Sequence, residues 1–206
     1  MNLIIKLLVV FVISSCSVQG IYNSYNYVYD RFNFESLEIS DDIKNLPYAS
    51  AIIQIDRNDQ VFSVLAKYKN AKYTWATSNK VYFETKNGKL IKTVGLENDF
   101  NITFIEEYAG LRGKSEGYIK FDNPDSGYLD IFFSYKEIEN GFFNTPISNK
   151  SLKYILIEET FSVPKIKWHG KNYYWVDKEF NVWLSKQELS PFGSSLKFKL
   201  LKKYSG

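Results

Sequence analysis

The chain has 206 residues, with 26 lysine and arginine residues against 23 acidic residues and a formal net charge of +3. The two signs alternate without long blocks, which argues against a nucleic-acid partner and is typical of a solvated surface. The 16 tyrosine, 16 phenylalanine and 4 tryptophan residues favour strands, and the length suits a domain with a sizeable core.

The N-terminal residues have the pattern of a secretory signal that ends at a lipid-acceptor cysteine. Lys6 precedes an apolar run over 7–13, which is too short for a permanent membrane span. The run leads into Ile13-Ser14-Ser15-Cys16, which resembles the lipobox of bacterial lipoproteins, and Cys16 is the single cysteine of the chain. We therefore predict a cleaved signal peptide over 1–15 and fatty acylation, by chains such as palmitate, at Cys16. The alternatives are an ordinary signal peptide with an incidental cysteine and a buried N-terminal helix.

Acylation of Cys16 would attach the protein firmly to a membrane, because two or three acyl chains bind far more tightly than one. In enterobacterial lipoproteins an aspartate after the acceptor favours the inner membrane, and this chain has Ser17 there. We therefore expect an outer-membrane anchor with the protein facing the periplasm. No disulfide is expected, because no second cysteine exists.

Residues 16–45 are expected to form a lipidated tether with short helices. Apolar residues recur at helical spacing over 21–32. Further on, Ser40 followed by Asp41 and Asp42 is typical of the start of a one-turn helix that runs to Asn45. The remainder, 46–206, is expected to be a single β domain.

Short β-rich segments separated by turn residues fill this domain. The clearest hairpin has Asn87-Gly88 at its tip, a pair that accepts the positive φ angles of a type I′ turn. Residues 141–149 are expected to be irregular. The fold predicted is all-β: an antiparallel sandwich, barrel or strongly curved sheet with a short N-terminal helix. The expected strands cover 48–55, 61–68, 81–85, 90–94, 101–108, 117–121, 128–136, 151–163, 172–177, 181–185 and 196–201.

Residues that could carry catalysis or bind a metal are scarce. The single imidazole, His169, lies in a segment over 168–172 that is expected to be an exposed turn, and no nucleophile elbow accompanies it. One histidine cannot build a zinc site, so no metal or cofactor is expected. The adjacent carboxylates Glu158 and Glu159 should point to opposite faces of a strand. Carboxylates from distant strands could still converge, as in glycosidases.

The aromatic residues are the remaining candidates for a binding surface. Exposed together, they could form a platform that stacks sugar rings, and the alternative is that they fill the core of a β domain. The candidates for contact with a glycan or a partner are Trp75, Trp168, Tyr174, Trp175 and Trp183, with Tyr173 beside them.

Three segments, read together behind the lipobox, carry a resemblance to a known family. They cover 43–50, 75–96 and 174–191. In this order they resemble the YjbF/GfcB family of outer-membrane lipoproteins, which is encoded with group-four capsule and related exopolysaccharide operons. The chain departs from the family at 110–116, where an aromatic and basic stretch is expected and Gly-Leu-Arg-Gly-Lys-Ser-Glu stands instead.

The resemblance implies an accessory role in polysaccharide secretion or capsule assembly, beside a porin-like outer-membrane partner, with no catalytic residues to carry over. Trp175 and Trp183 are expected to pack across the last hairpin. The first hypothesis is thus a non-catalytic, membrane-tethered β protein that binds glycan or a partner through an exposed aromatic patch or a sheet edge. The second is a periplasmic glycan hydrolase with two carboxylates across a cleft. The third is a lipid carrier, which requires a large apolar pocket.

Overall fold

The computed structural model describes residues 39–58, 60–106 and 110–204, which belong to one compact unit, Ile39–Gly206. The signal peptide, Cys16 and the helix expected over 21–32 lie outside the described residues. Among the helices that are described, none has the length and apolar character needed to span a membrane.

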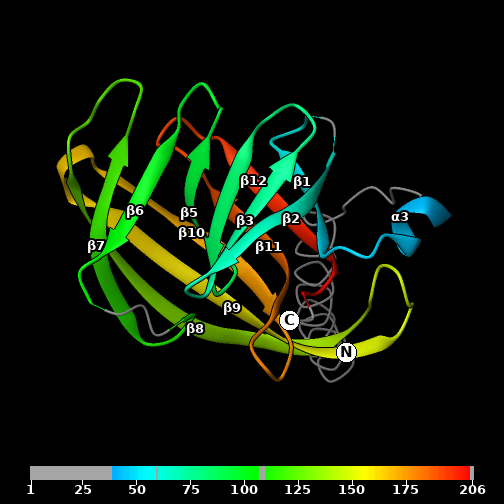
Figure 1. The fold of residues 1–206 in the computed structure, drawn as a ribbon. Helices are drawn as coiled ribbons and strands as arrows, with labels where there is room; N and C mark the ends of the chain where they lie inside the picture. The colour runs from blue at the N-terminus through cyan, green and yellow to red at the C-terminus, as the bar shows by residue number, and fades with distance from the viewer. Residues whose placement is uncertain (1–38, 59, 107–109, 205–206) are drawn as a thin grey trace, which may run out of the picture. The chain divides into compact units, whose positions relative to one another are not determined.

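Twelve antiparallel strands form a closed barrel in this part of the chain (Figure 1). Each strand pairs with its neighbour in the sequence, and the first strand pairs with the last to close the sheet. The all-β prediction is therefore confirmed, and of its three alternatives the barrel is the one observed. The strands are β1 (Ser50–Ile55), β2 (Val61–Lys69), β3 (Lys72–Thr77), β4 (Tyr82–Lys86), β5 (Lys89–Val94), β6 (Phe100–Phe104), β7 (Lys114–Phe121), β8 (Leu129–Asn144), β9 (Ser151–Val163), β10 (Trp168–Val176), β11 (Val182–Glu188) and β12 (Ser195–Lys202).

Two short helical elements accompany the barrel. The expected one-turn helix is present as α3 (Asp41–Asn45), with Asp41 and Asp42 in its first turn and a 2.7 Å ion pair between Asp41 and Lys44. A 3-10 turn, η1 (Pro164–Ile166), connects β9 to β10.

Three segments differ from the sequence prediction, each for a local reason. β3 was not expected, because Asn70 and Ala71 form the preceding turn with positive φ angles of 53° and 59° and without a glycine. β8 continues to Asn144 because its outer half pairs with β9. The segment 168–172 is strand and not an exposed turn, because Lys167 takes a left-handed conformation that directs the chain into β10.

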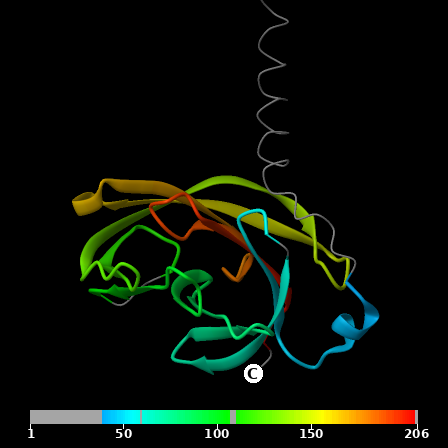
Figure 2. The same ribbon diagram turned by 90° about the horizontal axis from the view of Figure 1, so that it is seen from above.

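Alternate residues of the strands fill the interior of the barrel. The large buried cluster includes Ile53, Phe83, Ile119, Phe161 and Leu196, which come from strands all around the sheet. Figure 2 views the barrel from above, with β8 and β9 along one wall and β2 and β3 on the opposite side. Closure by β1 and β12 leaves no free sheet edge among the described strands, so the edge that the first hypothesis allowed as a binding surface is absent there.

The β4–β5 hairpin packs against the inner face of β11. Its tip is the expected type I′ turn, with φ angles of 49° at Asn87 and 77° at Gly88. Gln187 of β11 donates to the Gly88 carbonyl at 3.2 Å and accepts from the Leu90 amide at 2.9 Å. A β-carbon at Gly88 would collide with Val182, so glycine is required for this close approach as well as for the turn.

An ion pair inside the barrel holds the hairpin in place. Lys89 follows the turn, and its Nζ lies 2.7 and 2.6 Å from the two carboxylate oxygens of Glu159 on β9. Both residues are buried, at 1% and 0% exposure. Asn172 donates to the same carboxylate at 2.5 Å, and the Tyr174 hydroxyl donates to Gln187 at 3.1 Å. The pair is therefore part of a network that joins β5, β9, β10 and β11.

Lys89 also contacts an aromatic ring, since its Nζ lies 3.9 Å from the ring centroid of Phe133. Burial lowers the pKa of Lys89 from its ordinary value, and the Glu159 carboxylate offsets part of that effect. Two charges removed from water carry a large desolvation penalty, which only such complete pairing compensates. The network thus fixes the position of the hairpin more than it adds net stability.

We predict that Lys89→Met lowers the free energy of unfolding by about 3–5 kcal/mol, because it leaves the Glu159 carboxylate buried without a cation. The free energy of unfolding of the double variant Lys89→Met/Glu159→Gln should fall by much less than the sum of the decreases caused by Lys89→Met and Glu159→Gln alone. Urea denaturation followed by tryptophan fluorescence measures all three.

Lys72→Met is the matched control, because Lys72 forms a 2.9 Å pair with Glu84 in which both side chains remain partly exposed to solvent. The free energy of unfolding of Lys72→Met should fall by no more than about 1 kcal/mol. Equal losses for Lys72→Met and Lys89→Met would contradict the role given to the buried pair.

Candidate functional site

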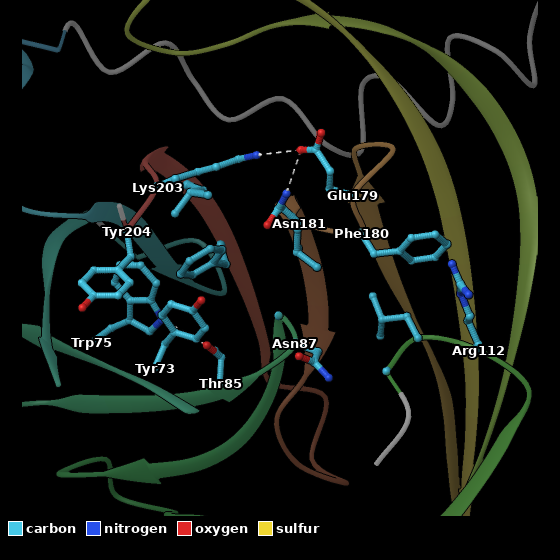
Figure 3. A pocket seen from close by; sticks show the side chains of 16 residues that line it. Tyr73, Trp75, Thr85, Asn87, Arg112, Glu179, Phe180, Asn181, Lys203 and Tyr204 are labelled. Carbon is cyan, nitrogen blue, oxygen red and sulfur yellow. Dashed lines mark hydrogen bonds and ion pairs between the residues drawn. The ribbon is translucent and has the colours of Figure 1, made fainter. Parts of the chain in front are cut away.

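A cavity of about 440 Å³ opens at one end of the barrel, where the hairpin tip, the β10–β11 turn and the end of β12 meet. Its lining combines aromatic rings with amide, guanidinium and carboxylate groups (Figure 3). The described residues that line it are Tyr73, Trp75, Thr85, Asn87, Gly88, Gly110, Leu111, Arg112, Glu179, Phe180, Asn181, Val182, Phe198, Leu200, Lys203 and Tyr204.

One wall of the cavity is aromatic. Tyr73 and Trp75 are two residues apart on β3, so their rings lie on the same face, 6.2 Å apart and nearly parallel at 12°. Tyr68 pairs with Tyr73 across β2 and β3, and their ring centroids are 4.7 Å apart. The ring centroid of Tyr204 lies 5.1 Å from that of Tyr68. Tyr68 and Tyr204 are 46% and 48% exposed, so this aromatic wall continues to the molecular surface.

The inner end of the aromatic wall is fixed by polar contacts. The Trp75 indole N–H donates to the Thr85 hydroxyl at 3.1 Å, across the β3–β4 pair. Burial raises the pKa of Tyr73, and the neighbouring Tyr68 adds to that effect. Tyr73 therefore stays neutral well above physiological pH and presents an uncharged phenol to the cavity.

The β10–β11 turn forms the polar side of the cavity and is organised by Asp177. One oxygen of this carboxylate accepts from the backbone amides of Glu179 and Asn181, both at 3.0 Å. The other accepts from the Trp183 indole at 3.0 Å and from Lys203 at 2.6 Å. Asp177 thus joins the turn to the core and to the end of β12.

The Asp177 carboxyl has a lowered pKa. Burial acts to raise this pKa, but the hydrogen bonds from Lys203, Trp183 and Asn181 outweigh the burial. Asp177 is therefore an ionised anchor and is unsuited to act as a general acid, which requires a raised pKa.

Arg112 lies beside the same turn. Its guanidinium stacks on the Phe180 ring, with 3.7 Å between the guanidinium carbon and the ring centroid. In Figure 3 this pair lies on one side of the cavity and Tyr73, Trp75 and Tyr204 lie on the other, with Asn87 and Asn181 between them. Glu179 is the only carboxylate among the described lining residues.

Cys16 lies outside the described residues, and all five aromatic candidates are buried, at 9% exposure or less. Trp75 is the one of the five that lines the cavity. Trp168 packs on Phe161 with ring centroids 4.7 Å apart, and Tyr174 belongs to the Glu159 network. These positions agree with the core-filling alternative. The exposed aromatic residues nearest the cavity are Tyr68 and Tyr204, which the sequence did not single out.

Trp175 and Trp183 do not pair across the β10–β11 hairpin. Trp175 pairs with Leu184 and Val176 with Val182, so Trp183 is the extra residue of a β-bulge. Trp183 packs on Phe143 in the core, with ring centroids 6.0 Å apart. The bulge was not visible in the alternation of the sequence.

Several of the carboxylates that the hydrolase hypothesis could use are engaged in structural contacts. Glu158 and Glu159 do lie on opposite faces of β9, since Glu159 pairs with buried Lys89 and Glu158 with exposed Lys171 at 3.0 Å. A second hollow of about 850 Å³ is lined by several acids. Of these, Glu139 accepts from Tyr154 at 2.7 Å and Asp177 is the anchor described above.

The other two expectations concern metals and lipids. His169 lies on β10 opposite Ser162, and the described residues contain no group of three or more His, Cys, Asp or Glu side chains that could hold a metal. The space inside the barrel around Lys89 and Phe133 measures about 20 Å³, far too small for an acyl chain. This part of the interior is filled by side chains and does not form the pocket of a lipid carrier.

The described residues thus define a closed antiparallel β-barrel that has a cavity lined by aromatic and polar side chains at one end. The chain belongs to the family described as "Group 4 capsule polysaccharide lipoprotein gfcB, YjbF", which matches residues 35–119 and 127–201. The resemblance noted in the sequence is therefore confirmed. The family is described as a lipoprotein of capsule polysaccharide and not as an enzyme.

Individual proteins similar to this chain include two lipoproteins of Escherichia coli. The uncharacterized lipoprotein YjbF of Escherichia coli (strain K12) is 25% identical over 187 residues, which is 79% of each chain. The crystal structure of the hypothetical lipoprotein YmcC from Escherichia coli (K12) covers 89% of this chain and 96% of its own, with a TM-score of 0.68 and 18% identity. At this identity the second likeness concerns the fold alone.

Sequence reasoning missed the pairing of Lys89 with Glu159 and the role of Arg112. Glu158 and Glu159 were placed on opposite faces of a strand, but nothing local shows that Glu159 meets Lys89. Arg112 lies in the loop where an aromatic and basic stretch was expected, and Phe180 from a distant turn supplies the aromatic ring there.

We predict that Asp177→Asn destabilises the protein by about 2 kcal/mol at pH 7, because charge-assisted hydrogen bonds to the turn and to Lys203 are weakened. The folded-state pKa of Asp177 lies below its ordinary value of 3.8. The stabilisation is therefore complete above pH 3.8 and is lost as the pH falls through the lowered pKa. Thermal unfolding at several pH values measures both effects.

The variant should accordingly show a shallower loss of stability between pH 4 and pH 2 than the wild type. Asp130→Asn, at an exposed position of β8, is the control. It should change neither the midpoint of thermal unfolding nor the slope of that midpoint against pH. An unchanged acid transition in Asp177→Asn would contradict the anchor role.

Proposed function

We propose that the protein is a non-catalytic lipoprotein that supports capsule or exopolysaccharide secretion or assembly by binding glycan in the cavity at the end of the barrel. The observation that carries the proposal is the aromatic wall of Tyr68, Tyr73 and Tyr204, which reaches the surface beside the amides of Asn87 and Asn181. The family description supports the link to capsule polysaccharide.

The chemistry of the cavity suits a sugar chain. Aromatic faces provide flat apolar area for the C–H face of a sugar ring, while a few fixed polar groups select its hydroxyls. Here Asn87 and Asn181 can each donate and accept, and Glu179 can accept. Tyr204 both lines the cavity and is exposed, so a sugar chain could continue past it to the surface.

The anchor and the location complete the proposal. Acylated Cys16 would hold the barrel at the outer membrane on the periplasmic side, where a growing or exported polysaccharide passes. A porin-like export protein is the proposed partner at that membrane. The barrel would then present a glycan site close to the export channel.

We predict that deletion of the gene lowers surface polysaccharide and that wild-type protein restores it. Cys16→Ala should restore it only weakly at equal protein level, because the barrel would no longer be concentrated at the membrane. Quantification of surface uronic acid or hexose, with membrane fractionation of both proteins, provides the measurement. Unchanged polysaccharide after deletion would refute the export role, and full restoration by Cys16→Ala would refute the need for the anchor.

We further predict that Tyr68→Ala/Tyr204→Ala weakens binding of purified capsule oligosaccharides by about tenfold, because the two rings supply apolar contact area that contributes about 25 cal/mol per Å² removed from water. Isothermal titration calorimetry of the soluble barrel with such oligosaccharides measures the loss.

The matched control is Tyr118→Ala/Tyr128→Ala. These tyrosines are also exposed and form a ring pair with centroids 6.4 Å apart. Neither of them lines the cavity, whereas Tyr204 lines it and Tyr68 packs on the lining residue Tyr73. If both double variants bind equally well, the cavity is not the glycan site.

A further inference from the structure

Arg112 is the cation of the cavity that no carboxylate of the described residues neutralises. The other lining cation, Lys203, lies 2.6 Å from Asp177 and 3.8 Å from Glu179. For Arg112, no carboxylate of the described residues lies within ion-pair distance, and its contact is the ring of Phe180. The hydrogen-bonding edge of its guanidinium therefore remains available at the wall of the cavity.

The Phe180 ring that carries Arg112 has a fixed position. Phe180 takes a positive φ angle of 62°, and its amide donates to the Asp177 carbonyl at 2.9 Å. Asp177 in turn holds the turn through its carboxylate. A guanidinium stacked on a fixed ring loses less conformational entropy when it binds a ligand than a freely moving one does.

Arg112 lies against Phe180 on the side of the cavity opposite the aromatic wall, with Asn87 and Asn181 between them (Figure 3). A sugar chain that stacks on Tyr73 or Tyr204 can therefore extend across the cavity toward the guanidinium. The planar guanidinium fork matches a carboxylate in a two-point contact, which a hydroxyl cannot reproduce.

We propose that the cavity selects acidic sugars, with Arg112 binding the carboxylate of a uronic acid residue in the polysaccharide. The inference rests on the proposed glycan-binding function and specifies the class of its ligand. The aromatic wall supplies affinity for the ring, and Arg112 supplies the preference for an acidic sugar over its neutral counterpart.

The experiment compares two matched probes: a hexuronic acid oligosaccharide and the same oligosaccharide after reduction of its carboxyl groups to primary alcohols. Isothermal titration calorimetry measures both with the full-length protein in detergent, in 50 mM and 300 mM salt. We expect the acidic probe to bind about tenfold to a hundredfold more tightly, as a charge-assisted pair of hydrogen bonds contributes. The preference should decrease at the higher salt concentration.

Arg112→Gln should remove the preference and leave binding of the reduced probe unchanged, while Arg112→Lys should retain only part of it because the fork is lost. Arg57→Gln, at an exposed arginine outside the cavity lining, is the matched control and should behave as wild type. Arg112 is exposed, so these variants should fold, and their thermal midpoints verify this.

The outcomes separate this inference from the function on which it rests. Equal binding of both probes by the wild type overturns the acidic preference and leaves the glycan site standing. A preference that survives in Arg112→Gln overturns the assignment to Arg112. If neither probe binds, and neutral and acidic capsule oligosaccharides do not bind either, the glycan site itself fails. Competition by inorganic phosphate that equals competition by free glucuronate would show a general anion site and would also overturn the uronate assignment.

Discussion

The buried pair between Lys89 and Glu159 is the constraint on which the arrangement of the barrel depends. A lysine this deep in an apolar interior is tolerated only where a carboxylate is held at the same point, and Asn172 fixes that carboxylate. The hairpin tip therefore has one position, against β11, in which both charges are satisfied. Hydrophobic contacts are non-directional and would allow the hairpin to shift.

The position of the hairpin determines where the barrel is filled and where it is open. On one side of Lys89 the interior is packed with side chains, and the remaining space is about 20 Å³. On the other side, Asn87 and Gly88 line the cavity of about 440 Å³. The same turn thus closes the core and forms part of the cavity lining, and Asp177 fixes the opposite part through the β10–β11 turn. Both sides of the proposed glycan site are held by buried carboxylates.

The sequence prediction was accurate where the structure depends on interactions between residues close in the chain, and it failed where distant residues decide the structure. The Asn87-Gly88 turn and the strand over 151–163 were predicted well, because turn chemistry and alternation act over a few residues. β3 was missed, because Asn70 and Ala71 make a glycine-free turn with positive φ angles. The cross-strand packing of Trp175 and Trp183 was wrong, because a bulge reverses the direction of one side chain and leaves no trace in the composition.

The sequence by itself determined the strand content, the absence of a usual set of catalytic residues, the family, and the prediction of an anchor at Cys16. These depend on residue types and on spacings that are local in the chain. Only the tertiary structure decided that Lys89 meets Glu159 across 70 residues and that Arg112 stacks on Phe180. Closure of the barrel brings distant strands to one point, and the geometry of that closure is set by bulges, register and packing together, which no single segment encodes.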